Sequence, residues 1–432
     1  MEGEALKKLL SLLFVSVLSA SLFLSGCGGT KQTSSNSGGS KELTAWAWNV
    51  NVKVLKKAAA DFAKTHKGFK LKIVEISNND AYQKITTGLQ AGGKGLPDIL
   101  LIEDDRVQGY LNNFPDGFVN LSKKGFNKEK SKFPNYKMQL LTKNGSVYGF
   151  PFDSGPAGVF YRTDIFKQAG VDPKSIETWD DYIKAGKTIK KKTGKDMIGI
   201  DYNNDDGQYR IILNTLGTFY FDQNGKPVLT SKDSVQAMKI LQQMKQAGIT
   251  KNTSGWDPWV SALANGDVVS APTGAWFAGS LIQQAPDLAG KWSVFPIPSV
   301  EKGGSHAANN GGSNFLIPKA SQHQDLAYNF MNFFSTSDKI QEYAMQEGGL
   351  FPSLQTVYNT NTFKEKGSYF TQDNIWQMFA DEMKNIKVAN YTENYSIAKD
   401  EAVKAQSKIM NGKDVKESLE EAQKNLKNRM NQ

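Results

Sequence analysis

The chain has 432 residues, of which 39% are hydrophobic and 22% are charged. These values are typical of a globular protein with a large core and exclude a chain that is mainly disordered or membrane-embedded. Basic residues (52) outnumber acidic ones (43), but they are spread along the chain without an Arg-rich block, which argues against nucleic-acid binding. The single cysteine, Cys27, excludes a disulfide framework and a cysteine-based metal site.

The N-terminus has the pattern of an export signal. Lys7 and Lys8 precede the apolar stretch Leu9–Leu24, which is short for a membrane span, and Leu24-Ser25-Gly26-Cys27 resembles a bacterial lipobox. We therefore expect residues 1–26 to be a lipoprotein signal peptide, with the lipid attached to Cys27; the alternative is a free cysteine behind an ordinary signal peptide. Residues 27–40, rich in Gly, Ser and Thr, are expected to be a flexible tether. The expected location is the outer face of a bacterial cell membrane, of the Gram-positive type.

Alternating strands and helices are predicted after the tether. Residues 43–48 and 69–76 form apolar or alternating runs typical of strands, and the apolar positions of 52–65 recur at helical spacing. A second helix is expected to be capped by Asn78-Asn79-Asp80, and residues 96–102 form a third strand. This βαβαβ order predicts a mostly parallel sheet with helices on its faces.

The rest of the chain continues as an α/β protein. Residues 144–152 indicate a hairpin that runs into a further strand, and residues 231–247 indicate a long amphipathic helix. Residues 309–314 (NNGGSN) are expected to form a Gly-rich turn before the strand 315–317. The charged tail, residues 395–430, is expected to be helical.

The segment Leu263–Gly279 (LANGDVVSAPTGAWFAG) carries the main functional signal. A helix ends there, an Asn-Gly-Asp turn follows, and a strand at 268–270 is expected to break at Pro272 and to expose Trp276. Ligands of open α/β sheets collect beyond the carboxyl ends of strands. An aromatic ring flanked by small residues is suited to stack on a sugar there, although a Trp after a turn also packs in cores.

The helix, turn, strand and Gly-x-Trp together resemble the signature of extracellular solute-binding proteins of sugar importers, a family that includes the maltodextrin-binding proteins. Further segments are similar to that family in the same order and cover nearly the whole chain after the tether: Gly95 with Pro97-Asp98-Ile99, Gly145 with Tyr148-Gly149 and Pro151, Tyr161-Arg162-Thr163-Asp164, and Thr178-Trp179-Asp180-Asp181. The resemblance implies a type II periplasmic-binding-protein fold of two lobes joined by three crossings. One lobe is then expected at 41–153 and 311–350, and the other at 154–310 and 351–432.

The candidate site combines aromatic rings, which cover the C–H face of a sugar, with polar groups, which bond its hydroxyls. The resemblance implies that Trp276 stacks on a sugar ring. The rings proposed for stacking are Trp48, Trp256, Trp276, Phe351, Tyr391 and Tyr395, and the other candidate contacts are Asn49, Asn79, Asp80, Glu103, Asp104, Asp153 and Gly312. Structural alternatives remain open for several of them: either Trp46 or Trp48 belongs to the core, Asp80 caps a helix, and Trp256 packs from outside.

By this resemblance, we expect a monomer that binds a sugar, most simply an oligosaccharide, and delivers it to the membrane permease of an ABC transporter. No catalytic residue, cofactor or metal is expected, since the three histidines are far apart in sequence and no phosphate-binding loop is present. Two alternatives stay open. One is an extracellular glycosidase that uses two of Glu103, Asp104, Asp153 and Asp257. The other is a binding protein of the same fold for a polyamine or a glycerol phosphate.

Overall fold

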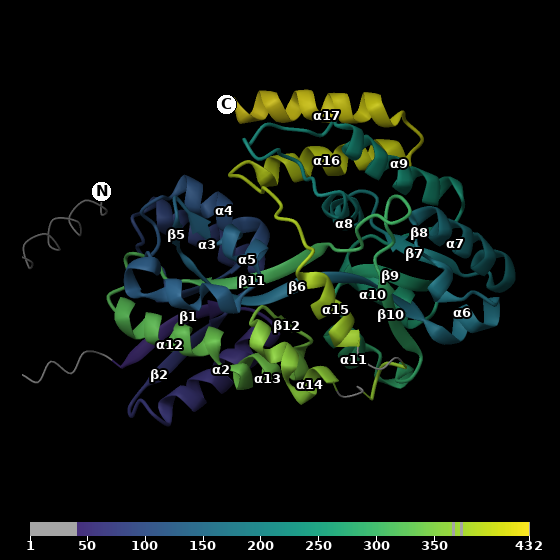
Figure 1. Cartoon of the computed structure of the whole chain (residues 1–432). Coiled ribbons are helices and arrows are strands. Elements are labelled where there is room, and N and C mark those ends of the chain that lie inside the picture. Colours follow the sequence, from purple (N-terminus) through teal and green to yellow (C-terminus); the bar gives the residue numbers. More distant parts are fainter. Residues whose placement is uncertain (1–40, 365–367, 372–374, 432) are drawn as a thin grey trace, which may run out of the picture. The chain divides into compact units, whose positions relative to one another are not determined.

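The computed structural model describes residues 41–364, 368–371 and 375–431 (Figure 1). The expected signal peptide, the lipidated Cys27 and the tether lie outside the described residues. Within this part of the chain, no helix is both long and apolar enough to cross a membrane.

The first lobe begins with the predicted βαβαβ unit. Strands β1 (Glu42–Ala47), β2 (Lys70–Glu75) and β3 (Ile99–Glu103) are parallel, with β1 in the middle, and they alternate with helices α2 (Val50–Ala63), α3 (Asn78–Gln90) and α4 (Asp104–Asn113). The cap of α3 differs from the prediction, because the Ser77 side chain accepts the bond from the Asp80 amide and the helix already starts at Asn78. Asp80 therefore lies in the first helical turn, where its charge favours the positive end of the helix.

A second parallel unit forms the core of the other lobe. Its strands are β7 (Asp196–Ile200), β8 (Thr250–Asn252) and β9 (Val268–Gly274), with β7 in the middle. The helices around them are α6 (Thr163–Ala169), α7 (Trp179–Thr193), α8 (Gly207–Thr215), α9 (Lys232–Gln246), α10 (Trp256–Ala264) and α11 (Phe277–Gln284). A capping box of Thr178 and Asp181 starts α7, and Asp180 and Asp181 lie in its first turn, near the positive end of the helix.

The long strand β6 (Gly149–Arg162) joins the two parallel units into one sheet and is buried along its whole length (Figure 1). Its first half pairs with β11 (Asn309–Leu316) and β12 (Phe351–Pro352), and its second half pairs with β9 and β10 (Trp292–Pro296). All of these pairings are antiparallel, so the sheet is parallel in its outer strands and antiparallel around β6. The fold is thus the expected α/β arrangement of two lobes.

Two turn predictions near β6 are wrong. Residues 309–314 are not a turn but the first part of β11, which accommodates the two glycines through a register shift, with φ of 108° at Gly311 and 109° at Gly312. Strand β9 does not break at Pro272, which pairs with Val159 of β6. Pro272 lies beyond the residues of β9 that pair with β7. Proline has no backbone N–H to donate, so it is tolerated in a strand where no neighbouring strand requires that hydrogen bond.

The C-terminal part is helical but consists of several segments. Helices α12 (Gln324–Thr336) and α13 (Asp338–Gly348) precede β12, and α14 (Asn361–Lys364) and α15 (Ile375–Met383) follow it. The tail is a pair of packed helices, α16 (Tyr395–Met410) and α17 (Val415–Met430), rather than one. Gly412, with φ of 90°, lies in the turn between them.

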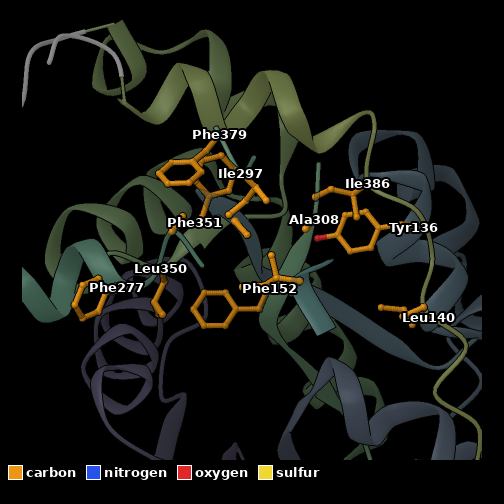
Figure 2. Close-up of a cluster of buried hydrophobic side chains, with 14 of the residues drawn as sticks. Tyr136, Leu140, Phe152, Phe277, Ile297, Ala308, Leu350, Phe351, Phe379 and Ile386 are labelled. Atoms are coloured by element: carbon orange, nitrogen blue, oxygen red, sulfur yellow. The ribbon is translucent and has the colours of Figure 1, made fainter. Parts of the chain in front are cut away.

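Buried aromatic residues fill the space beneath the centre of the sheet. Figure 2 shows Phe351 together with Phe152, Phe277 and Phe379 in this core. Phe351 is fully buried, and its ring centroid lies 5.6 Å from that of Phe363 and 6.1 Å from that of Phe379. This residue, expected to stack on a ligand, is therefore a core residue.

Candidate ligand-binding site

A cavity of about 880 Å³ lies where β1, β3 and β9 end and β6 meets β11. This volume is in the range of small-molecule sites, which run from roughly 300 to 1,000 Å³. The lining residues that matter most are Trp48, Asn49, Asn78, Glu103, Asp104, Asp105, Asp153, Arg210, Trp256, Trp276, Ser280, Gln283, Asn310, Gly311, Gly312 and Tyr391. Both lobes contribute, because Glu103 follows β3 and Trp276 follows β9.

Trp276 lies in the wall of the cavity, in space that two glycines leave open. The indole Nε1–H donates to the carbonyl of Asn310 at 2.8 Å. A Cβ at Gly274 would lie 2.4 Å from this nitrogen, and one at Gly311 would lie 3.0 Å from it. The Gly-x-Trp sequence thus has a steric reason: the indole folds back over Gly274 and against β11.

A second tryptophan extends this aromatic wall. The rings of Trp256 and Trp276 have centroids 5.9 Å apart and planes inclined by 38°. Trp256 starts α10 and is 43% exposed, which is unusual for so large an apolar side chain. The pair offers the cavity a broad apolar surface with a fixed polar edge at the Trp276 nitrogen.

The first lobe contributes Trp48 and Glu103. Trp48 follows β1, packs edge-on against Tyr82 with centroids 5.8 Å apart, and is only 6% exposed. The Tyr82 hydroxyl donates to Glu103 Oε2 at 2.9 Å and accepts from the Glu103 amide at 3.1 Å. Burial raises the pKa of Glu103 to about 7, and the negative charge of Asp105 adds to the rise.

A buried ion pair forms the floor. Lys137, fully buried on a short helix (Asn135–Leu140), donates from Nζ to Asp104 Oδ1 and to the carbonyl of Asp153. Asn314 Nδ2 also donates to Asp104 Oδ1, at 2.8 Å. Burial raises the pKa of the Asp153 carboxyl to about 6, against the opposing effect of Lys137.

The position of Gly312 beside the Asp104–Lys137 pair admits only a glycine. Its φ of 109° favours glycine, and a Cβ there would lie 2.7 Å from Asp104 Oδ2 and 3.0 Å from Lys137 Nζ. Asp104 Oδ2 and Asp153 Oδ1 have no hydrogen-bond partner among the described residues. Since both carboxylates line the cavity, these oxygens are acceptors that a ligand can satisfy.

Replacing Glu103 with glutamine is expected to stabilise the fold at high pH. A carboxyl whose pKa rises from 4.5 to about 7 on folding makes the protein less stable as pH rises through that interval, because the folded state holds its proton longer. Glutamine stays neutral throughout, so the gain in unfolding free energy should grow between pH 5 and pH 8, up to about 3 kcal/mol. Urea unfolding at the two pH values measures this gain, and a difference that does not change with pH would contradict the prediction.

The structure brings most of the predicted site residues together. Those that line the cavity are Trp48, Asn49, Glu103, Asp104, Asp153, Trp256, Trp276, Gly312 and Tyr391. Those that do not line it are Asn79, Asp80, Phe351 and Tyr395. Asn78, the first residue of α3, lines the cavity, whereas the expected Asn79 does not. Tyr395 is 2% exposed and stacks on Tyr220 with centroids 6.1 Å apart, so it is a core residue.

Several lining residues were not predicted. Arg210 is the clearest case: it lines the cavity, and its Nε lies 2.9 Å from Oδ1 of the buried Asp206, the residue just before α8. Asp105 and Asn310 are among the other polar lining residues that were not predicted, together with Asn51, Asn78, Ser280, Gln283, Gln284 and Ser313. The acidic run 103–105 pointed to Asp105, but no local pattern pointed to Arg210.

The three histidines lie apart and each has a local partner. His66 stacks on Phe62 with centroids 3.7 Å apart, His306 Nδ1 lies 2.7 Å from the Ile297 carbonyl oxygen, and His323 Nδ1 lies 3.1 Å from Asp98 Oδ1. Among the residues that the structure describes, no group of His, Cys, Asp or Glu is arranged to hold a metal ion.

An α/β fold of two lobes around one aromatic and acidic cavity defines a protein of the periplasmic-binding type. The chain belongs to the family of bacterial extracellular solute-binding proteins, whose model matches residues 57–371. It is 37% identical over 358 residues to the lactose-binding protein of Rhizobium radiobacter, covering 81% of this chain and 84% of that protein. It is 29% identical to the arabinooligosaccharide-binding protein of Bacillus subtilis, covering 84% of each chain.

Solved structures agree with this assignment. An ABC transporter associated binding protein from B. animalis subsp. lactis, in complex with β-1,6-galactobiose, superposes with a TM-score of 0.73 at 26% identity, covering 90% of this chain and 97% of that one. The sugar-binding protein MalE of Xanthomonas citri superposes with a TM-score of 0.76 over 90% of this chain and 98% of that one. Its identity is 18%, so this likeness concerns the fold.

Proposed function

We propose that this protein binds an oligosaccharide outside the cell, as a monomer, and delivers it to the permease of an ABC importer. The observation that carries the proposal is the cavity itself, whose lining combines the Trp256–Trp276 pair with Glu103 and with oxygens of Asp104 and Asp153 that have no partner among the described residues. Aromatic faces and hydroxyl-bonding carboxylates are the two surfaces that a neutral sugar ring requires. Two relatives are named for binding lactose and arabinooligosaccharides, and a similar solved structure holds β-1,6-galactobiose, which supports a ligand of two or more sugar rings.

Transport requires that binding change the conformation. The proposed lobes are 41–153 with 311–350 and 154–310 with 351–432, and they meet at the chain crossings near Asp153, Asn310 and Leu350. A sugar that contacts both Glu103 and Trp276 binds the closed arrangement better than the open one, and this differential affinity drives closure. The permease then recognises the closed form. In this proposal a lipid on Cys27 holds the protein at the outer face of the membrane.

Calorimetric titration of the purified protein tests the proposal. The panel is lactose, β-1,6-galactobiose, and arabino-, malto- and xylo-oligosaccharides, with spermidine and glycerol 3-phosphate as the non-sugar alternatives. A saturable heat with one sugar series, and intact sugar after hours of incubation, is the expected result. Shortened products would identify a glycosidase instead. Binding of spermidine alone would mean that the carboxylates recognise a cation, and silence with every sugar would contradict the proposal.

Replacing Gly274 with alanine is expected to weaken sugar binding about tenfold, equal to about 1.4 kcal/mol. The added Cβ would lie 2.4 Å from Trp276 Nε1 and 2.5 Å from the Asn310 carbonyl oxygen, so the indole has to leave its place in the wall. Gly109→Ala in α4 is the matched control, because the new Cβ would meet its nearest neighbour at 3.7 Å, an ordinary contact. Equal affinities of Gly274→Ala and the unaltered protein would contradict this reason for the glycine.

A further inference from the structure

A second cavity of about 380 Å³ opens beside the main one. The two share Arg210, Trp256, Trp276 and Asn310 in their linings. We call the second cavity the side chamber; its own walls are Gly199, Asp205, Gln208, Thr253, Trp259 and Thr273. These residues come from the end of β7, the start of α8, the loop after β8, and helix α10 and strand β9. The side chamber is therefore built within the second lobe, behind the two tryptophans.

Two polar atoms in the side chamber have no partner. Thr253 is 3% exposed, and its Oγ1 forms no hydrogen bond with any described residue. Gln208 Oε1 is also buried without a partner, although its Nε2 donates to the Pro272 carbonyl at 2.8 Å and so fixes the amide. Leaving a buried polar group unpaired costs about 1 to 3 kcal/mol, so a ligand that satisfies both atoms gains by entering.

The carboxylates of the acidic loop at the chamber, Asp201 and Asp205, already accept hydrogen bonds from nearby backbone amides. Asp201 Oδ1 accepts from the amides of Asn203 and Asn204 at 3.0 and 3.1 Å, and its Oδ2 accepts from the Gly255 amide at 2.9 Å. Asp205 Oδ2 accepts from the Gly207 amide at 3.0 Å. These bonds shape the loop, and the lining also holds the hydroxyl of Thr253 and the amide oxygen of Gln208, which have no partner among the described residues.

Trp259 adds an aromatic surface to the lining of the chamber. The ring of Trp259 lies with its centroid 5.5 Å from that of Trp256, so the apolar wall of the main cavity continues into the chamber. A hydroxyl can both donate and accept, an amide oxygen accepts, and an indole covers C–H groups. This combination fits a sugar ring rather than an ion or a lipid chain. The volume is also within the range for a small-molecule site.

We propose that the side chamber holds one further ring of the oligosaccharide, so that the natural ligand is longer than a disaccharide and its terminal ring contacts Thr253, Gln208 and Trp259. This inference rests on the proposed function. It adds that ligand length is recognised in the second lobe, behind the tryptophan wall, and not only between the lobes.

Calorimetry with a length series of two to five rings, in the linkage that the protein binds, tests the inference. The unaltered protein should bind the longer members at least about tenfold more tightly than the disaccharide. Thr253→Val removes the hydroxyl with little change in shape and should weaken binding of the longer members about fivefold, while the disaccharide changes less than twofold. Thr250→Val is the control, because Thr250 Oγ1 bonds the Tyr202 hydroxyl at 2.7 Å and does not line the chamber.

Each other outcome has a definite meaning. Equal affinity for sugars of all lengths would overturn the proposal that the side chamber binds a further ring, while sugar binding itself stands. So would a Thr253→Val protein that melts at a higher temperature and keeps every affinity unchanged. An equal loss for the disaccharide and the longer sugars would also overturn it, because Thr253 would then belong to the shared site. If no sugar of any length binds, both the side chamber and the proposed function fall.

Discussion

Replacing Trp276 with alanine is expected to weaken sugar binding roughly 30- to 150-fold, about 2 to 3 kcal/mol. The indole offers the cavity a large apolar face in a fixed position, because its N–H is bonded to Asn310 and its ring lies against Gly274 and Gly311. Alanine removes both the contact area and the preorganised geometry. Calorimetric titration with the tightest-binding sugar measures the loss.

The control for this variant is Trp376→Ala. Trp376 is a half-buried tryptophan of α15 that packs near Phe351 and Phe379 and does not line the cavity. The control is expected to lose stability but to keep its affinity for the sugar. A folded Trp276→Ala protein that binds sugar as tightly as the unaltered protein would show that the tryptophan wall is structural.

Replacing Lys137 with methionine is expected to lower the unfolding free energy by about 3 to 5 kcal/mol. Lys137 is fully buried and is the cation that compensates Asp104, which is 1% exposed. Without it, the carboxylate remains buried with only Asn314 as a neutral donor. Chemical unfolding monitored by circular dichroism measures the change.

Two further variants show whether this loss comes from the buried charge. Asp104→Leu combined with Lys137→Met should recover most of the stability, because replacing both partners leaves no unpaired ion. Lys408→Met breaks the exposed pair with Glu421, in which the two side chains are 45% and 54% exposed, and should cost less than about 1 kcal/mol. Equal losses for Lys137→Met and Lys408→Met would contradict the structural role of the buried pair.

The sequence predicted the elements that local patterns determine. Strand β1 and helix α2 follow from apolar runs and apolar spacing, and the structure confirms them. The position of Trp276 at the end of β9 followed from a compact motif in one stretch of the chain. Gly311 and Gly312 were harder to interpret, because a glycine pair signals a turn and a strand irregularity equally well.

The composition of the cavity was less predictable, for a physical reason. Phe351 and Tyr395 are aromatic residues of the kind that stack on sugars, and nothing in their neighbouring sequence distinguishes them from such residues. Only the packing of distant segments shows that they belong to the core. Arg210 reaches the cavity because α8 lies beneath β11, a contact between residues far apart in the chain. Asn78 lines the cavity and the expected Asn79 does not, because successive side chains of a helix point about 100° apart.

A crystal structure of the complex with the tightest-binding sugar of the panel tests the central claim most directly. The proposal predicts a sugar ring against the face of Trp276, with hydroxyls bonded to the free oxygens of Asp104 and Asp153 and to Glu103. A sugar bound elsewhere would contradict it, for instance in the separate cavity of about 780 Å³ that is lined by Glu177 and His306.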